Sequence, residues 1–241
     1  MEVTSTEIQN NFGTYLKLAQ VEEVFVTRNG KRIAVLKYWD EPCAHLMNAA
    51  ESKVLYREEH PRISVEEFLK LSDASENRYE LIDGEIYQWA SPSYEHQRIL
   101  GEIFNQFYQC LQGKKCRPVM APFDVILFKD DIQNIVQPDI IVICDPEKID
   151  GQGKYNGIPE LAVEILSETT RNKDMLKKLN LFMCGGVKEY WIVNPWNREI
   201  YIYAFESGEI QNYRVFKGHE HAGSGVLQGL NVPLEKVFLT E

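Results

Sequence analysis

Long hydrophobic runs and an excess of basic residues are both missing from this sequence of 241 residues. No apolar stretch approaches the roughly 20 residues that a membrane-spanning helix requires, so we expect no membrane partner. The N-terminal segment MEVTSTEIQNNF is polar and does not have the apolar core of a secretory signal. The formal net charge of −10 argues against a protein that coats nucleic acid through many Lys and Arg contacts to phosphate.

Cysteine is also scarce, and its spacing matches no known disulfide or metal-binding pattern. The count of five is odd, and no two cysteines are spaced as C-x-x-C. This usage is typical of a reducing compartment and argues against a disulfide framework and against a zinc site. We therefore expect a cytoplasmic protein without disulfide bonds. The apolar content of 44% supports a folded core, and the length is sufficient for one full domain and one small one.

The first part of the chain has the pattern of a small α/β unit. Thr4 or Ser5 is placed to cap a helix, with Glu7 as the capping-box partner. Farther along, Asn29–Gly30 lies between two β-rich runs and is a strong hairpin signal. About forty residues is small for an independent fold, and oligomerisation is the usual remedy.

The segment VTSTEIQNNFGTYLKLAQ, followed by VFVTRNGKRIAVL, resembles the N-terminal domain of Phd/YefM antitoxins. The resemblance implies that residues 1–42 form a domain that dimerises and binds operator DNA, so we expect a homodimer or a higher homo-oligomer. Arg28, Lys31 and Arg32 are the candidates for contacts to DNA phosphates, although a charged hairpin tip is more often merely solvated. Gln9 stands where members of that family often carry an arginine for DNA contact, which weakens the expectation of operator binding.

Between the two prolines Pro42 and Pro61 the sequence loses part of its periodicity. We interpret residues 43–60 as a linker helix between domains. After it, Ser64 predicts the N-cap of a short helix, and Ser93 opens a longer amphipathic helix.

Two apolar runs in the middle of the chain each carry one acidic residue. Residues 140–143 are β-branched throughout and predict a buried strand with Asp139 at its mouth. Residues 161–166 alternate as a strand does, and Glu164 lies between apolar neighbours. A carboxylate in such a place is costly to bury unless something pairs with it. Two hard oxygen ligands on adjacent strands would suit a magnesium ion.

A helix predicted over residues 171–185 supplies a cation after these two acids. Asp174 and Lys178 are four residues apart, so they share one helix face and are placed to pair. Taken singly, Glu164 and Lys178 are also explained as members of local solvated pairs. Asp139 after a proline, Glu164 on a strand and then Lys178 on a helix, taken together, are harder to explain as unrelated solvated pairs.

The segments QPDIIVICD, PELAVEILSETT and GGVKEYWIVNP, together with YELIDGEI and SPSYEH, resemble the Uma-two family of the PD-(D/E)xK restriction-endonuclease-like superfamily. The likeness covers roughly residues 61–205. It implies an α/β (α+β) fold in residues 61–241, with a mixed β-sheet flanked by helices. It also implies a Mg²⁺- or Mn²⁺-dependent nuclease that hydrolyses phosphodiester bonds, with DNA as the expected nucleic acid.

The resemblance also implies roles for individual residues. Asp139 and Glu164, with the carbonyl group of Ile165, would hold the metal ion. Lys178 would stabilise the developing negative charge or help to deprotonate the attacking water, and Asp174 would position Lys178.

Glu80 and His96 are further catalytic candidates from the resemblance. From the residues alone, Glu80 is equally well explained as a rim carboxylate paired with Arg78, and His96 as a capping or solvated histidine. The superfamily motif E-x-K places a lysine two residues after the glutamate, but this chain has Leu166 there. Members of the Uma-two family also lack that lysine. In that family a lysine on the following helix, at the position of Lys178, takes its place. This chain departs from the family at Phe182, where members usually carry tyrosine.

Two other functions are compatible with the same sequence. One is a DNA-binding regulator whose nuclease-like domain is catalytically silent and mediates interactions. The other is a toxin–antitoxin fusion in which the first domain localises or restrains the nuclease.

Overall fold

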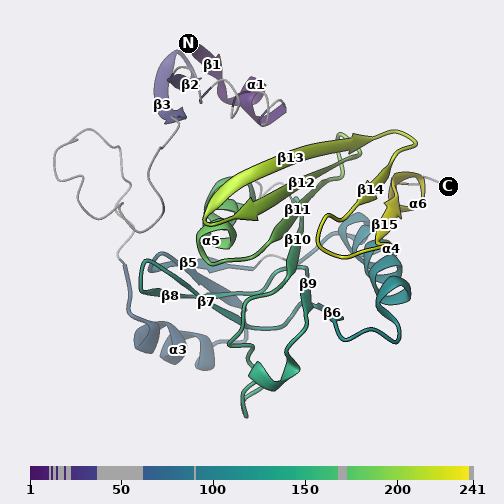
Figure 1. Cartoon of the computed structure of the whole chain (residues 1–241). Coiled ribbons are helices and arrows are strands. Elements are labelled where there is room, and N and C mark those ends of the chain that lie inside the picture. Colours follow the sequence, from purple (N-terminus) through teal and green to yellow (C-terminus); the bar gives the residue numbers. More distant parts are fainter. Residues whose placement is uncertain are drawn as a thin grey trace. The chain divides into compact units, whose positions relative to one another are not determined.

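The computed structural model describes residues 1–10, 12, 15, 19, 23–36, 62–89, 91–167 and 173–238. The chain divides into two units, Met1–Glu58 and Glu59–Glu241 (Figure 1). The linker helix predicted over residues 43–60 lies outside the described residues. Within the ranges given, no helix combines the length and the apolar character that crossing a membrane requires.

The first unit contains a three-stranded sheet with the order β1-β2-β3. β1 and β2 are parallel, whereas β2 and β3 form an antiparallel hairpin. Asn29 and Gly30 both have positive φ, 52° and 72°, as the predicted tight turn requires. The elements of this unit are β1 (Glu2–Thr4), α1 (Ser5–Asn10), β2 (Val24–Arg28) and β3 (Lys31–Leu36).

A capping box begins the first helix. The Thr4 hydroxyl accepts the Glu7 N–H at 3.1 Å, and the Glu7 carboxylate accepts the Thr4 N–H at 2.8 Å. The predicted cap is therefore present, with Thr4 rather than Ser5 as its residue. A small apolar core lies behind it, formed by Val3, Ile8, Phe12, Ala19, Val24 and Val26.

A six-stranded mixed sheet forms the centre of the second unit, with the order β13-β12-β11-β10-β9-β6. β10 and β11 are parallel, and the other neighbouring pairs are antiparallel. The predicted mixed sheet is thus present. Its strands are β6 (Arg117–Met120), β9 (Ile140–Ile143), β10 (Leu161–Ile165), β11 (Glu189–Asn194), β12 (Glu199–Glu206) and β13 (Glu209–Lys217).

A second, antiparallel sheet has the order β5-β4-β8-β7. Helix α3 (Val65–Asp73) begins at Ser64 with the predicted capping box and buries Phe68 near this sheet. Leu71 of the same helix is 48% exposed, although its spacing from Phe68 is that of a shared helix face. The strands are β4 (Tyr79–Ile82), β5 (Glu85–Gln88), β7 (Val125–Lys129) and β8 (Ile132–Val136).

Helices cover both faces of the six-stranded sheet. On one face, Phe107 of α4 (Tyr94–Leu111) packs edge-on against Trp191 of β11, with ring centroids 5.4 Å apart. On the other face, Phe182 of α5 (Leu179–Cys184) packs against Tyr190, at 4.9 Å. Successive residues of a strand face opposite sides, so these two contacts identify the two faces. On the α4 side the core is completed by β14 (His221–Gly223), β15 (Asn231–Pro233) and α6 (Leu234–Phe238) (Figure 1).

The helix predicted over residues 171–185 differs from a regular α-helix. Its first described part, Lys173–Lys178, is a π-helix, and α5 continues from it to Cys184. Gly186 then adopts φ 85°, a left-handed conformation that favours glycine, and the helix ends before it. Residues 168–172, where the predicted helix would begin, lie outside the described residues.

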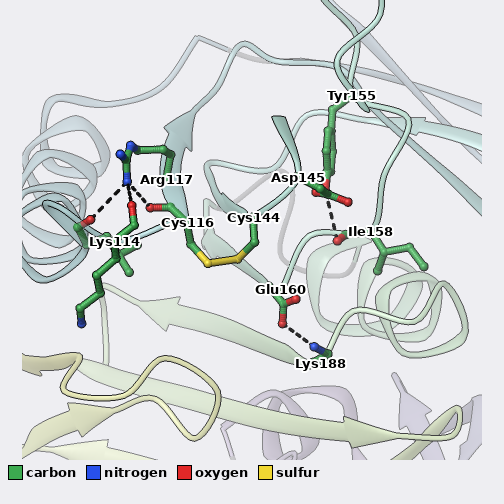
Figure 2. The surroundings of a disulfide bond; sticks show 10 residues. Lys114, Cys116, Arg117, Cys144, Asp145, Tyr155, Ile158, Glu160 and Lys188 are labelled. Atoms are coloured by element: carbon green, nitrogen blue, oxygen red, sulfur yellow. Dashed lines mark hydrogen bonds and ion pairs between the residues drawn. A yellow bond between two sulfur atoms is a disulfide. The ribbon is translucent and has the colours of Figure 1, made fainter. Parts of the chain in front are cut away.

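Cys116 and Cys144 form a disulfide bond, so the expectation of a chain without disulfides is wrong (Figure 2). The two cysteines lie 28 residues apart in the sequence, with Cα atoms 4.0 Å apart. They meet because β6 pairs antiparallel with β9, with Arg117 opposite Ile143, which places the preceding and following residues side by side. The Arg117 guanidinium donates to the carbonyl groups of Lys114 and Cys116 beside the bond (Figure 2). Sequence spacing could not show this pairing, because it depends on which strands are neighbours.

Candidate functional site

A cavity of about 810 Å³ in the second unit collects most of the predicted site residues. Asp139, Glu164, Ile165, His96 and Lys178 all line it. They come from the start of α4, the two central strands and the π-helix. Glu80 does not line the cavity, but it contacts the lining residue Lys178.

Asp139 occupies the end of the sheet where β9 begins and β10 ends. In the antiparallel register Ile140 faces Val163, so the preceding Asp139 lies beside the last residues of β10. Its Oδ2 accepts the N–H of Ile165 at 2.7 Å and lies 3.3 Å from Nε2 of His96. The residue is only 5% exposed, and these contacts fix the direction of its carboxylate.

Glu164 points to the opposite face of β10 from Val163, which packs in the α4-side core. Its Oε1 accepts a hydrogen bond from Nζ of Lys178 at 2.5 Å. Burial raises the pKa of Glu164 well above its ordinary value; Lys178 opposes this effect, whereas the charges of Asp174 and Asp139 add to it. The predicted buried acid is therefore present, and a lysine is its closest partner.

Lys178 is held almost fully buried between carboxylates from both sheets. Its Nζ lies 2.5 Å from Glu164, 2.7 Å from Glu80 and 3.9 Å from Asp174. The predicted pair with Asp174 is thus present, but it is the longest of the three. Burial alone would lower the pKa of Lys178, and the three carboxylates, with Glu164 first, raise it above its ordinary value instead. The raised pKa favours the ammonium form of Lys178.

Glu80 is fully buried on β4 of the smaller sheet. One oxygen accepts the N–H of Gln137 at 2.8 Å, and the other pairs with Lys173 at 2.5 Å. Burial would raise the pKa of Glu80, but Lys178 and Lys173 outweigh it and hold the pKa below its ordinary value. Its partners are lysines of the π-helix, so the alternative of a rim carboxylate paired with Arg78 is not observed.

Lys173 is a second buried cation that the sequence did not predict as a site residue. Its side chain is 9% exposed, pairs with Glu80 and lines the cavity. Lys173 and Lys178 are five residues apart, which is one turn of a π-helix, so both ammonium groups reach the same carboxylate. An α-helical reading turns Lys173 away from Lys178, and no other signal in the sequence identifies it.

His96 combines a helix-terminal position with a place in the site. Its backbone N–H donates to the Ser93 hydroxyl at 3.2 Å, whereas its ring faces Asp139. Burial tends to lower the pKa of His96, but Asp139, the Ile165 backbone and Asp174 raise it above its ordinary value. Nδ1 is buried and has no hydrogen-bond partner in the described part of the chain. The imidazole is thus neither a cap nor a solvated side chain.

The predicted DNA-contact residues lie in the first unit. Arg28, Lys31 and Arg32 are all exposed. Arg32 is also engaged within the unit, because it pairs with Glu2 at 2.6 Å and lies over the Phe25 ring at 4.1 Å.

The donor chemistry of the cavity fits a hard divalent cation. Asp139 Oδ1 and Glu164 Oε2 accept no hydrogen bond from the described residues. Ile165 follows Glu164 in the chain and donates its N–H to Asp139 Oδ2. No cluster of three or more His, Cys, Asp or Glu side chains arranged to hold a metal is found in the described ranges. Oxygen atoms of two carboxylates and a carbonyl group, completed by water, suit Mg²⁺ or Mn²⁺.

The charge balance supports the same fit. Four buried carboxylates, those of Glu80, Asp139, Glu164 and Asp174, face three basic groups in this region. Lys178 pairs with three of them, Lys173 with Glu80, and the His96 imidazole with Asp139. Buried charges are usually paired or bound to metal. A divalent cation at Asp139 and Glu164 would neutralise the excess negative charge.

Comparisons with known proteins agree with this architecture. The model of the Uma2 family, described as "Putative restriction endonuclease", matches residues 65–235. The uncharacterized protein slr1290 of Synechocystis sp. is 28% identical over 144 residues, which cover 59% of this chain and 74% of that protein. A crystal structure of a "putative nuclease belonging to DUF820" from Anabaena variabilis is 21% identical, with a TM-score of 0.61, and covers 73% of this chain and 97% of that chain. At that identity, the structural likeness shows the fold.

Proposed function

The chain belongs to the Uma2 family, and from this premise we propose that it is a metal-dependent nuclease whose active site is the cavity around Asp139, Glu164 and Lys178. The observation that carries the proposal is the convergence of these three side chains, from separate elements, on one cavity with an excess of buried carboxylates. A purely structural ion pair would need only one acid for each lysine.

The roles follow from the contacts. Asp139 and Glu164, with the carbonyl group of Ile165, would hold Mg²⁺ or Mn²⁺, and Ile165 also fixes Asp139 through its N–H. When bound, such an ion lowers the pKa of a water molecule and stabilises charge on the phosphoryl oxygens. The raised pKa of Lys178 favours an ammonium group that stabilises negative charge over a base that removes a proton. A single donor of this kind contributes roughly 3 kcal/mol to the transition state.

Asp174 and Glu80 would act on Lys178 rather than on the substrate. Glu80 reaches Lys178 from the smaller sheet, and Asp174 reaches it from one helical turn earlier. His96 would orient the Asp139 carboxylate from the side of α4.

We propose in addition that residues 1–42 are a Phd/YefM-like domain that binds DNA and joins two copies of the chain. Its capped helix, its hairpin and the exposed cations Arg28 and Lys31 support this proposal. DNA is accordingly the nucleic acid that we expect as substrate.

One observation favours a second function, that of a catalytically silent DNA-binding regulator or a toxin–antitoxin fusion. Leu166 replaces the lysine of E-x-K, and the substitute Lys178 already pairs with Glu164. In that case the cavity would bind no ion, and the first unit would carry the DNA affinity.

Incubation of the full chain with single-stranded and duplex DNA and RNA, in Mg²⁺ or Mn²⁺, tests the nuclease proposal. We expect cleavage that EDTA stops and that Asp139→Asn and Glu164→Gln abolish, whereas Glu209→Gln on the exposed part of β13 leaves it unchanged. Calorimetric titration with Mn²⁺ should show one site that Glu164→Gln removes. Absence of both cleavage and ion binding, with tight binding to a DNA operator, would establish the regulator instead.

A further inference from the structure

The cavity has an aromatic part beside its charged part. Resting on the proposed nuclease function, we propose that the substrate enters the cavity as unpaired nucleotides, with a base stacked on Trp196, and not as an intact duplex. The substrate class is therefore single-stranded nucleic acid or a single-stranded end.

Trp196 is fixed in a position suited to stacking. It lies in the turn between β11 and β12 and lines the cavity, while the residue keeps 48% of its surface exposed. The buried Asn194 side chain accepts the backbone N–H groups of Trp196 and Asn197 at 3.1 and 3.2 Å, which holds the turn. A partly exposed indole beside a cavity is the kind of platform on which single-stranded nucleic acid stacks its bases.

Trp89 adds a polar contact in the same cavity. Its backbone N–H donates to Arg78, while its indole Nε1 is buried and has no acceptor among the residues that the structure describes. A buried donor without an acceptor is costly. A carbonyl oxygen of a nucleobase, or a sugar oxygen, would satisfy it.

The charges of the cavity argue against binding driven by the phosphates of a duplex. Among the described lining residues, five are acidic (Glu76, Glu95, Asp139, Glu164 and Asp174) and three are basic. Two of the three bases, Lys173 and Lys178, are already paired with Glu80. Duplex binding depends on many Lys and Arg contacts to phosphate, and the chain has a net charge of −10. Affinity of the cavity for nucleic acid must therefore come from a contact other than phosphate pairing. Stacking of a base on tryptophan is such a contact, and it is possible only when the base is unpaired.

The volume is consistent with this substrate. At about 810 Å³, the cavity lies in the range of pockets that enclose a small ligand, roughly 300–1,000 Å³. Such a space accommodates one or two nucleotides but not both strands of a duplex.

Fluorescence anisotropy with labelled oligonucleotides, in EDTA so that no metal-dependent cleavage occurs, tests the proposal. All comparisons use the full-length chain carrying Arg28→Ala and Lys31→Ala, which removes the cations proposed to bind duplex DNA in the first unit. We expect this chain to bind a single strand, of DNA or of RNA, more tightly than the blunt duplex of the same sequence. Trp196→Ala should weaken single-strand binding about 5- to 100-fold, and Trp196→Phe should retain most of it. Phe128→Ala is the matched control, because Phe128 is an aromatic residue of β7 that is 59% exposed and does not line the cavity.

Equal or tighter binding of the blunt duplex would overturn the proposal, as would unchanged single-strand binding by Trp196→Ala or no single-strand binding by the chain that keeps Trp196. These outcomes are separate from the nuclease test. Asp139-dependent cleavage of duplex DNA, without a preference for single strands, would remove the stacking proposal and leave the nuclease intact. Single-strand binding that depends on Trp196, without cleavage in Mn²⁺, would support the stacking proposal and contradict the nuclease proposal.

Discussion

The ammonium group of Lys178 lies between carboxylates from two different sheets, Glu80 on β4 and Glu164 on β10. Removing this buried lysine leaves Glu164 without its cation and leaves Glu80 with Lys173 alone. Breaking a buried ion pair in this way typically costs about 3–5 kcal/mol, far more than the pair contributes when compared with an apolar replacement. Lys178 therefore contributes to the stability of the fold as well as to the proposed chemistry.

Lys178→Met should lower the free energy of unfolding by about 3 kcal/mol, because buried acids lose their cation. It should also reduce kcat by about 100-fold or more. Urea denaturation and the cleavage assay measure the two effects. Lys188→Met is the control, because Lys188 is 59% exposed and its pair with Glu160 lies on the surface. A Lys178→Met variant as stable as the wild type would contradict the ion-pair account.

Glu80→Gln should separate positioning of the lysines from binding of the metal. Glutamine keeps the size of the side chain but removes the charge that faces Lys173 and Lys178. We expect kcat to fall about 10-fold or more, while the Kd for Mn²⁺ measured by calorimetry stays within about 2-fold of the wild type. Loss of Mn²⁺ binding comparable to that of Asp139→Asn would make Glu80 a ligand instead.

Which individual residues reach the site was only partly predictable from sequence. Asp139 and Glu164 were predicted because each is an acid in or beside an apolar strand, and Lys178 because it follows Asp174 by four residues on one helix face. The structure places all three at one cavity. Lys173 was missed because its role depends on a π-helical turn, which has no clear sequence signature. The place of Trp196 beside the cavity depends on how the turn after β11 folds, which the sequence pattern does not specify.

At the scale of elements, local sequence patterns predicted most strands and helices, but they did not predict which strands pair with each other. The hairpins at Asn29–Gly30 and Asp83–Gly84, and the buried face of α4, agree with periodicity and turn chemistry. The antiparallel pairing of β9 with both β10 and β6 has no local signal. The β9–β10 pairing brings Asp139 to Ile165, and the β9–β6 pairing brings Cys116 to Cys144, which is why the disulfide was not foreseen.

The disulfide should contribute to stability by joining β6 to β9 across 28 residues of sequence. A loop of this length corresponds to roughly 3–4 kcal/mol in the chain-entropy account. We expect Cys116→Ser with Cys144→Ser to lower the free energy of unfolding by up to this amount, as measured by urea denaturation. Cys110→Ser, at a half-buried free thiol, is the control. If the double variant unfolds at the same urea concentration as the wild type, the bond does not stabilise the fold.

At the scale of the whole molecule, the two units divide the charges of a nucleic-acid-binding protein between them. The second unit has a cavity with more acidic than basic lining residues, which suits a metal ion and an unpaired strand. The first unit presents exposed cations on its hairpin, which suit the phosphates of a duplex. A strongly acidic chain can thus combine a duplex-binding unit with a nuclease unit, provided that each part meets a different form of the nucleic acid.

Arg28→Ala combined with Lys31→Ala should therefore weaken duplex binding and leave single-strand binding unchanged. Each lost phosphate contact should reduce the slope of log K against log salt by about 0.9, because fewer counterions are released on binding. Anisotropy titrations of blunt duplex and single strand over a series of salt concentrations measure both effects. Lys70→Ala is the matched control, since Lys70 is an exposed lysine of the second unit that pairs with Glu66. Should the double variant lose single-strand affinity as well, or keep the duplex slope of the wild type, the two units do not divide the substrate in this way.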